Sequence, residues 1–228
     1  MMISRKVVSV TPAVFVIAAA VVIVCIAPAA GLFARDSLDA VLDAIEKRYA
    51  GPGFAADFFQ HSTLKAMDIS DSAEGRVWVK RPGKMRWQYS KPEQQIVITN
   101  GRRLWIYRPL DKQVMVGKAP DMFGRGKGAA FLSDMSQLRK NFKITLVPSQ
   151  NPDYWRINLV PSDPGAEISR IVVSVSRKNY CIGQIVTYNA YGDETRIVMN
   201  NYDFKAALPD SLFEFEPPEN VEVVEIEP

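Results

Sequence analysis

The fold is decided by residues 75–109, GRVWVKRPGKMRWQYSKPEQQIVITNGRRLWIYRP. Short aromatic and β-branched runs alternate here with Pro and Gly turn signals, which is the pattern of β-strands joined by hairpins. Asn100-Gly101 is the strongest hairpin signal in the chain. The strands expected in this stretch are residues 75–80, 85–89, 95–99 and 104–107. We predict that they carry one wide apolar face, formed by Trp78, Met85, Trp87, Tyr89, Trp105 and Tyr107.

Alternating patterns continue on both sides of this stretch. Further strands are expected at residues 54–64, 113–116, 142–147, 155–160, 168–176, 182–188 and 194–204. One amphipathic helix begins at Asp36 or Ser37 and carries Leu38, Val41, Leu42 and Ile45 as an apolar stripe. A second helix is expected at 129–141, with Phe131, Leu132, Met135, Leu138 and Phe142 as its apolar residues.

Consecutive hairpins without α/β alternation predict a fold class of α+β, mainly β. We expect an unclosed, strongly curved antiparallel β-barrel of about ten or eleven strands, with helices covering the concave apolar face. The acidic end after Pro218 is either a last edge strand or a disordered tail.

The length of 228 residues, with 47% apolar residues, suits one domain, which we place at residues 35–228. Residues 1–34 are expected to be a signal peptide, because Arg5 and Lys6 precede a long apolar run. Two alternatives stay open for this segment. It is long enough to remain as an uncleaved anchor, and Cys25 could be lipidated, although Val24 before it is not the small residue that such a signal needs.

The charge is unevenly distributed. Residues 75–143 contain 16 Lys and Arg against four acids, whereas residues 203–228 contain eight acids and only Lys205. A basic flank can approach an anionic leaflet or an acidic partner, and the simpler alternative is that these side chains face solvent on strands. The net charge of +3 gives no indication of nucleic-acid binding.

No catalytic or metal-binding constellation can be assembled from the sequence. His61 is the only histidine, and Cys181 would be the only cysteine left after cleavage of the leader. No serine lies in a Gly-x-Ser-x-Gly turn, and the glycines of 124–128 are not followed by the Ser or Thr of a phosphate loop. We therefore expect no catalytic residues, no metal, no cofactor and no enzymatic activity.

The apolar face has two possible interpretations. It is either a solid core between sheet and helices, or the lining of a cavity for an apolar ligand. The number of methionines favours the cavity, because this flexible side chain adapts to irregular ligands. Arg81 precedes Pro82 at a strand end, which fixes a guanidinium at the rim of the apolar surface.

The chain resembles the outer-membrane lipoprotein carrier (LolA) family. The resemblance rests on Gly75-x-x-Trp78-x-x-Arg81-Pro82 with Trp87, on the hairpin Asn100-Gly101 with Leu104-Trp105-x-Tyr107, and on the closing Phe213-x-Phe215-x-Pro217-Pro218. It implies a periplasmic carrier of a Gram-negative bacterium, in which Arg81 latches the lid helices of the empty form. Met85, the basic glycine-rich loop at 118–128 and the long apolar N-terminus depart from the family pattern.

The resemblance also implies partners. These are lipoproteins with an acylated N-terminus, an inner-membrane ABC lipoprotein-release complex, and an outer-membrane receptor or the outer membrane itself; we expect a monomer. The predicted acyl-chain lining is Trp78, Met85, Trp87, Tyr89, Trp105, Phe131, Leu132, Met135, Leu42 and Ile45. The alternative function is a membrane-tethered envelope sensor that binds lipid or lipoprotein with the same fold, and a lipid hydrolase is a remote third.

Overall fold

The structure is a computed structural model that describes residues 37–119, 130–133, 135 and 138–226. The described residues fall within one compact unit, Asp36–Pro228. The predicted signal peptide at 1–34, Cys25 and most of the glycine-rich loop at 118–128 lie outside the described residues.

Twelve strands form a single sheet in the order β12-β6-β5-β4-β3-β2-β1-β11-β10-β9-β8-β7. All neighbours are antiparallel except β12 and β6, which run parallel. The strands are β1 (Gly53–Leu64), β2 (Ile69–Lys80), β3 (Lys84–Lys91), β4 (Gln95–Asn100), β5 (Arg103–Arg108), β6 (Gln113–Lys118), β7 (Phe142–Val147), β8 (Tyr154–Pro161), β9 (Ile168–Ser176), β10 (Ile182–Asn189), β11 (Glu194–Asp203) and β12 (Glu222–Glu225).

The prediction of an open, curved, mainly antiparallel sheet is confirmed. Strands β12 and β7 are its two edges and do not pair with each other, so the sheet is not closed. The eleven predicted strands are all present. The twelfth is β12, which decides that the acidic end is an edge strand over residues 222–225.

Helix α1 (Leu38–Arg48) forms where predicted, and Ser37 rather than Asp36 is its N-cap. The Ser37 hydroxyl oxygen accepts a hydrogen bond from the Ala40 N–H at 3.2 Å, which satisfies one backbone donor of the first turn. In place of one continuous helix at 129–141, the described residues form the 3₁₀ turn η1 (Ala130–Ser133) and the short helix α3 (Leu138–Asn141).

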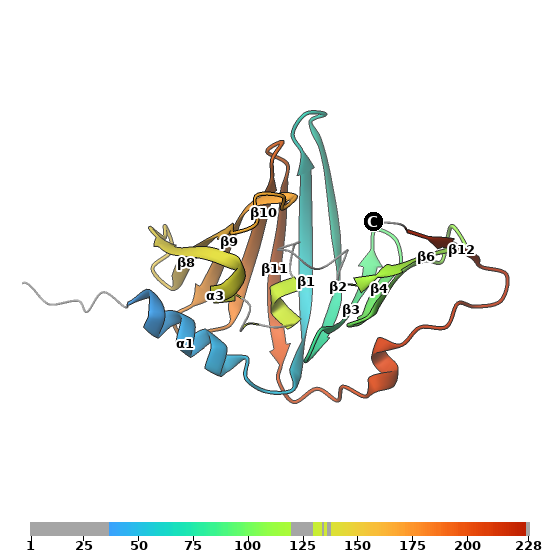
Figure 1. Cartoon of the computed structure of the whole chain (residues 1–228), viewed down its shortest axis with the longest axis horizontal. Helices are drawn as coiled ribbons and strands as arrows, with labels where there is room; N and C mark the ends of the chain where they lie inside the picture. Colours follow the sequence, from blue (N-terminus) through green and yellow to red (C-terminus); the bar gives the residue numbers. More distant parts are fainter. Residues whose placement is uncertain (1–36, 120–129, 134, 136–137, 227–228) are drawn as a thin grey trace, which may run out of the picture. The chain divides into compact units, whose positions relative to one another are not determined.

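The two faces of the sheet have different coverings. We call the face that carries Val77, Val79, Met85 and Trp87 the inner face; α1, η1 and α3 lie in front of it (Figure 1). Val77 and Val79 are fully buried there, and Val41, Leu42 and Ile45 of α1 belong to the same apolar cluster. The main core therefore lies between the inner face and these helices.

The prediction that Trp78, Trp105 and Tyr107 share a face with Met85 and Trp87 is wrong. Trp87 pairs with Val97, and Val97 pairs with Ile106, so Trp105 and Tyr107 point to the opposite, outer face. Trp78 also lies there, between the inward Val77 and Val79. Successive strand residues alternate between faces, and residues 104–107 are apolar at every position, so their pattern did not reveal which residues point inward.

The C-terminal segment covers the outer face of β4–β6. Phe215 packs on Tyr107 with ring centroids 5.2 Å apart, over a cluster that contains Ile98, Trp105 and Val114. The turn η3 (Asp210–Phe213) begins this segment, and β12 ends it by pairing with β6. We call residues 208–225 the strap; it contributes a partial layer on the outer face.

Candidate functional site

The inner face brings together most of the residues predicted to line an acyl site. They come from β3, from η1, from Met135 and from α1, although they lie far apart in the sequence. Those found in one buried cluster are Met85, Trp87, Phe131, Leu132, Met135, Leu42 and Ile45, with Tyr89 packed against it. Trp78 and Trp105 are not part of it. The site is thus the part of the inner face where residues of α1 and η1, together with Met135, belong to one cluster with residues of β1–β3.

Phe58 of β1 is a central residue of this site that the prediction missed. Its ring lies edge-on to Trp87 and to Tyr89, with both centroid distances at 4.9 Å. It is 3% exposed. The only sequence signal was the short pattern Phe54-x-x-x-Phe58-x-Gln60, which is too common to identify a site.

The side chains at the centre of the inner face are almost completely buried. Leu132 is 0% exposed, and Met85 and Met135 are only 2% and 3% exposed. A hydrocarbon chain can therefore reach Trp87 or Phe58 only if part of this buried cluster moves aside. Methionine and aromatic side chains can repack around a ligand of irregular shape, so the chemistry of this face suits exchange of self-contacts for ligand contacts.

The inner face becomes polar toward the end of the strands where β1 and β2 are joined. A groove of about 440 Å³ lies there, and it is lined by Gln60, Ser62, Asp71, Ser72, Ala73, Tyr89, Lys91, Pro92, Glu93, Gln94, Gln95, Arg108, Leu110 and Asp111. The Tyr89 hydroxyl donates to Gln60 Oε1 at 3.2 Å. Burial raises the pKa of Tyr89 to about 12, so this hydroxyl remains a neutral donor. The site thus has an apolar centre and a polar end.

Arg81 follows the last residue of β2, at the strand end expected from the Arg-Pro sequence. The backbone N–H of Arg81 donates to the Pro52 carbonyl oxygen at 2.9 Å. The Nε atom of its side chain is buried. The turn η1 contacts β2, the strand that ends beside Arg81. The backbone of Arg81 is therefore anchored beside the start of β1, at the end of a strand that η1 contacts.

A second arginine joins two of the covering helices. Arg139 of α3 contacts three carboxylates of α1, with N–O distances of 2.8 Å to Asp39, 2.5 Å to Asp43 and 2.9 Å to Glu46. Asp39 and Asp43 are largely exposed, and Glu46 is partly buried. We call this group the α1–α3 clasp. It ties the two helices on the side that faces solvent.

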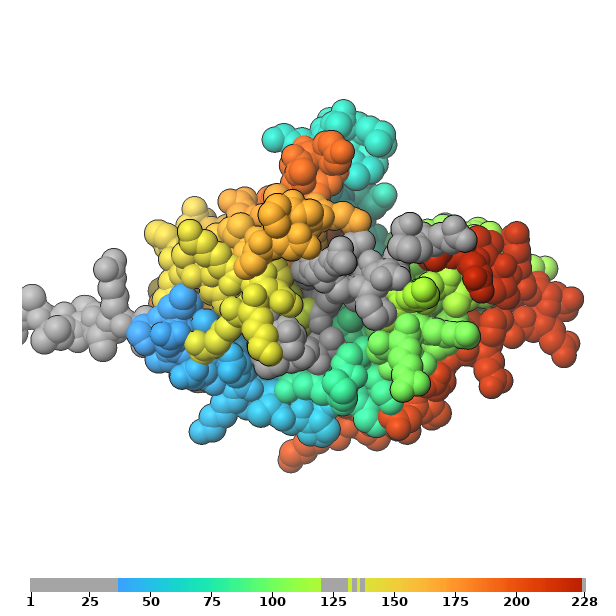
Figure 2. Space-filling view, in the orientation of Figure 1, coloured from blue at the N-terminus to red at the C-terminus, as the bar shows by residue number. Residues whose placement is uncertain are grey.

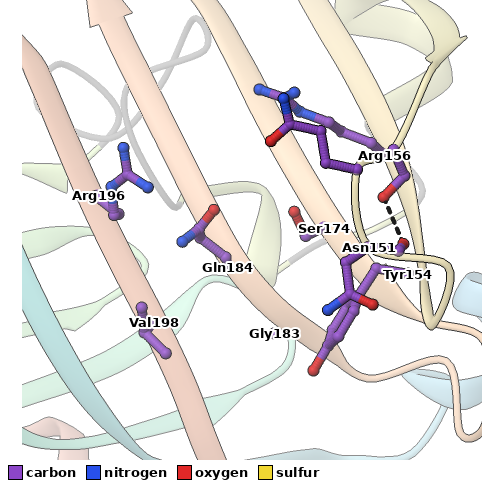
Figure 3. Close-up of a pocket in the computed structure, with 10 residues that line it drawn as sticks. Asn151, Tyr154, Arg156, Ser174, Gly183, Gln184, Arg196 and Val198 are labelled. Carbon is purple, nitrogen blue, oxygen red and sulfur yellow. Dashed lines mark hydrogen bonds between the residues drawn. The ribbon is translucent and has the colours of Figure 1, made fainter.

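The outer face offers a different chemistry. A pocket of about 380 Å³ over β8–β11 is lined by polar side chains, among them Arg156, Ser174, Gln184 and Arg196 (Figure 3). The ring of Tyr154 occupies the space above Gly183, where a Cβ atom would meet Tyr154 Cε1 at 2.7 Å. Such a lining does not suit hydrocarbon. The apolar candidate site is the inner face.

His61 lies on β1, and Cys181 directly precedes β10. His61 Nδ1 lies 2.9 Å from Ser72 Oγ on the neighbouring strand, and Cys181 is a buried free cysteine. Within the described ranges, no group of three His, Cys, Asp or Glu side chains could hold a metal ion. No helix in that part of the chain is both long and apolar enough to span a bilayer.

The fold and the site define a class of proteins built around one apolar sheet face under short helices. The sequence pattern described as "Outer membrane lipoprotein carrier protein LolA" matches residues 52–216. The chain belongs to this family. An "Outer-membrane lipoprotein carrier protein" of Chromobacterium violaceum is 31% identical over 196 residues, covering 86% of this chain and 92% of that protein. One of the same name from Bordetella pertussis is 27% identical, covering 94% and 95%.

A solved structure supports the fold independently. An uncharacterised conserved protein from Thermus thermophilus superposes with a TM-score of 0.54, covering 82% of this chain and 98% of that one. The sequence identity is 13%, so this similarity concerns the fold alone.

Proposed function

We propose that this protein is a non-enzymatic periplasmic carrier, which binds the acyl chains of lipoproteins on its inner face and delivers them to the outer membrane. The observation that carries the proposal is the buried cluster of Met85, Trp87, Phe131, Leu132 and Met135 beneath short helices. The names of the relatives, which match along most of their length, support it.

The energetics explain why such a cargo needs a carrier. Transfer of hydrocarbon from water is favourable by about 0.8 kcal/mol per CH₂, so three acyl chains represent roughly 30 kcal/mol of exposed apolar surface. A protein that shelters them must also release them. A face that closes on its own helices when empty meets both needs, because self-contacts replace part of what is lost on release.

The apolar centre would hold the acyl chains, and the polar groove would hold the start of the attached polypeptide. Tyr89 stands at the boundary: its ring contacts Phe58, while its hydroxyl bonds Gln60. Cargo binding on this scheme moves the covering elements α1, η1 and α3, which we call the lid, away from β2 and β3. Trp78 and Trp105 have no part in it, because they lie on the outer face.

Arg81 is proposed as the latch of the closed lid. A guanidinium has five donors in a fixed fork and can bind several carbonyl oxygens at a helix end. Its position after β2, the strand that η1 contacts, supports this role. The proposed partners are an inner-membrane lipoprotein-release complex as donor and an outer-membrane receptor, or the membrane itself, as acceptor, with export by the N-terminal signal peptide.

The test is transfer of a triacylated lipoprotein by the Arg81→Leu variant. We expect the variant to fold and to load cargo, but to deliver it to acceptor membranes at least about tenfold more slowly, because the closed state that competes with cargo is weakened. Lys178→Leu, at an exposed position between β9 and β10 and away from the proposed site, is the matched control. Normal delivery by Arg81→Leu would remove Arg81 from the mechanism, and failure of the unaltered protein to bind any acylated peptide would refute the carrier function.

The tethered-sensor alternative is not favoured by the names of the relatives. Fractionation separates the two functions, since a carrier is recovered in the soluble periplasm and a tethered sensor stays with membranes.

A further inference from the structure

Two hairpins project beyond the rest of the sheet. The β1–β2 hairpin continues to the pair Leu64–Ile69, whereas the pairing of β2 with β3 begins only at Glu74. The β10–β11 hairpin lies beside it, and both extend from the body of the molecule (Figures 1 and 2). We call residues 64–69 and 190–192 the tips.

The two neighbouring tips carry four of the large apolar side chains that are exposed among the described residues. Met67 is 66% exposed, Tyr191 84%, Ile69 46% and Leu64 41%. The other exposed large apolar side chains of the described residues lie away from the tips: Phe59 is in the middle of β1, and the rest are Leu110, Leu146, Val160 and Val223. Contiguous exposed apolar side chains at one place are a sign of a surface that contacts a partner or a membrane.

The two tips are held together as a unit. The Lys65 N–H donates to Asp193 Oδ1 at 2.9 Å, which joins the first hairpin to the second. The other oxygen of Asp193 accepts from Asn189 Nδ2 at 2.8 Å. The four apolar side chains are thus displayed on a fixed support.

We propose that the tips dock on the lipid surface of a membrane, inserting Met67 and Tyr191 into the interfacial region of zwitterionic phospholipid. The tips are convex, and a fluid bilayer accepts a convex apolar group without a preformed socket. Tyrosine is favoured at this depth because it has an apolar ring and a polar end, and Lys65 has a long aliphatic stem that can reach the headgroups.

The charge of the tips decides which lipid is favoured. Lys65 and Asp68 offset each other, and Asp193 bonds within the hairpins. Asp71 adds a negative charge just below the tip. A surface of this kind gains nothing from anionic headgroups, so docking is expected without them. This assignment is independent of lipoprotein carriage, because vesicles of pure lipid contain no lipoprotein.

The experiment uses the full chain with an environment-sensitive label at Met67→Cys, in a Cys25→Ser background that keeps the buried Cys181. The matched control carries the label at Leu110→Cys, which replaces a residue 71% exposed on the β5–β6 turn. The label reports local position, so other membrane contacts of the chain do not confuse the result. With phosphatidylcholine vesicles we expect the label at 67 to lose water accessibility about fivefold or more and the label at 110 to change little.

Adding Tyr191→Ser to the labelled Met67→Cys protein should reduce the protected fraction severalfold, whereas Leu110→Ser should not. The proposal is overturned if the label at 67 stays as accessible to water as the label at 110. It is also overturned if protection requires phosphatidylglycerol, or if it arises only with envelope membranes that contain protein, since the tips would then bind a protein.

Discussion

Close contacts and side-chain directions explain why the motif that begins at Gly75 has these residue types. A Cβ atom on Gly75 would lie 2.0 Å from the backbone oxygen of Gln88, so only glycine allows β2 and β3 to approach as they do. Val77 faces inward with no exposed surface, and Trp78 faces outward beside Arg76, whose guanidinium lies 5.8 Å from the indole. Gly75, Val77 and Trp78 therefore serve the packing of the sheet. Arg81 is the residue of this motif that remains a candidate for the latch of the lid.

Tyr49 provides a prediction about stability at the residue scale. It is 1% exposed, and its hydroxyl oxygen accepts the Ile182 N–H at 2.9 Å. Burial raises the pKa of Tyr49 well above its usual value, so the hydroxyl stays neutral. Tyr49→Phe leaves a buried N–H without this acceptor, and we expect the free energy of unfolding to fall by about 1–3 kcal/mol in urea titrations. Tyr191→Phe, at an 84% exposed site, should change it little.

At the scale of elements, the α1–α3 clasp joins two helices of the proposed lid. Exposed ion pairs are individually weak, although a guanidinium shared by three carboxylates forms a network. The hydrogen bond to Glu46 and, to a smaller extent, the one to Asp39 raise the pKa of Arg139 above its usual value, so the arginine remains charged. A weak clasp fits the proposed function, in which the two helices separate from the sheet together.

Arg139→Glu places a fourth carboxylate among Asp39, Asp43 and Glu46. We expect amide hydrogen exchange in α1 to become severalfold faster, because like charges at this distance repel, while the sheet exchanges as before. Lys140→Glu, at the next exposed position, is the control. Combining Arg139→Glu with Asp43→Arg should restore slow exchange, and unchanged exchange in Arg139→Glu would show that the clasp does not hold the helix.

The strap predicts a dependence on pH. Lys80 and Lys84 contact Asp210 at 2.7 and 2.9 Å and lower the pKa of this carboxyl to about 2. Because the folded pKa lies below the unfolded one of about 4, the attachment is present above pH 4 and is lost as the pH falls toward 2. Hydrogen exchange in η3 should accelerate over this window. Asp210→Asn should remove the pH dependence, and the exposed Glu219→Gln should retain it.

At the scale of the whole molecule, the uneven charge of the sequence finds its explanation. The acidic end lies on the basic middle region: Asp210 pairs with Lys80 and Lys84, and the Asn100 side-chain amide donates to Glu214 at 3.1 Å. The basic region therefore serves in part to bind the strap of the same chain. Lys80 and Lys84 are paired with Asp210 within the chain. Less positive charge is therefore available to attract an anionic leaflet than the sequence suggested.

Removing residues 214–228 should expose the outer apolar face. The deletion takes away Phe215, which covers Tyr107, and β12, which covers the edge of β6. We expect a loss of about 3 kcal/mol in the free energy of unfolding, a red shift of tryptophan emission from Trp105, and self-association through the open edge. Phe215→Ser should give the emission shift without the association. An unaltered monomer with unaltered emission would show that the strap protects neither feature.

The amino-acid sequence predicts some elements of this protein better than others. The strands, α1 with its cap, and the open antiparallel class were predictable, because alternation and turn residues act locally. Eight of the ten proposed lining residues meet at one place. Trp78 and Trp105 do not, and Phe58, the clasp and the strap were missed, because contacts between distant segments leave no local pattern.

The sequence by itself determined the kind of sheet, the family of the protein and the uneven distribution of charge along the chain. These follow from residue type and spacing over a few positions. Only the tertiary structure decided which aromatic residues face inward, which arginine joins the lid helices, and which surface the acidic end covers. A strand that is apolar on both sides has no preferred face until its neighbours pair with it. Ionic partners separated by about a hundred residues are likewise chosen by the fold, because proximity in space and not in sequence sets their attraction.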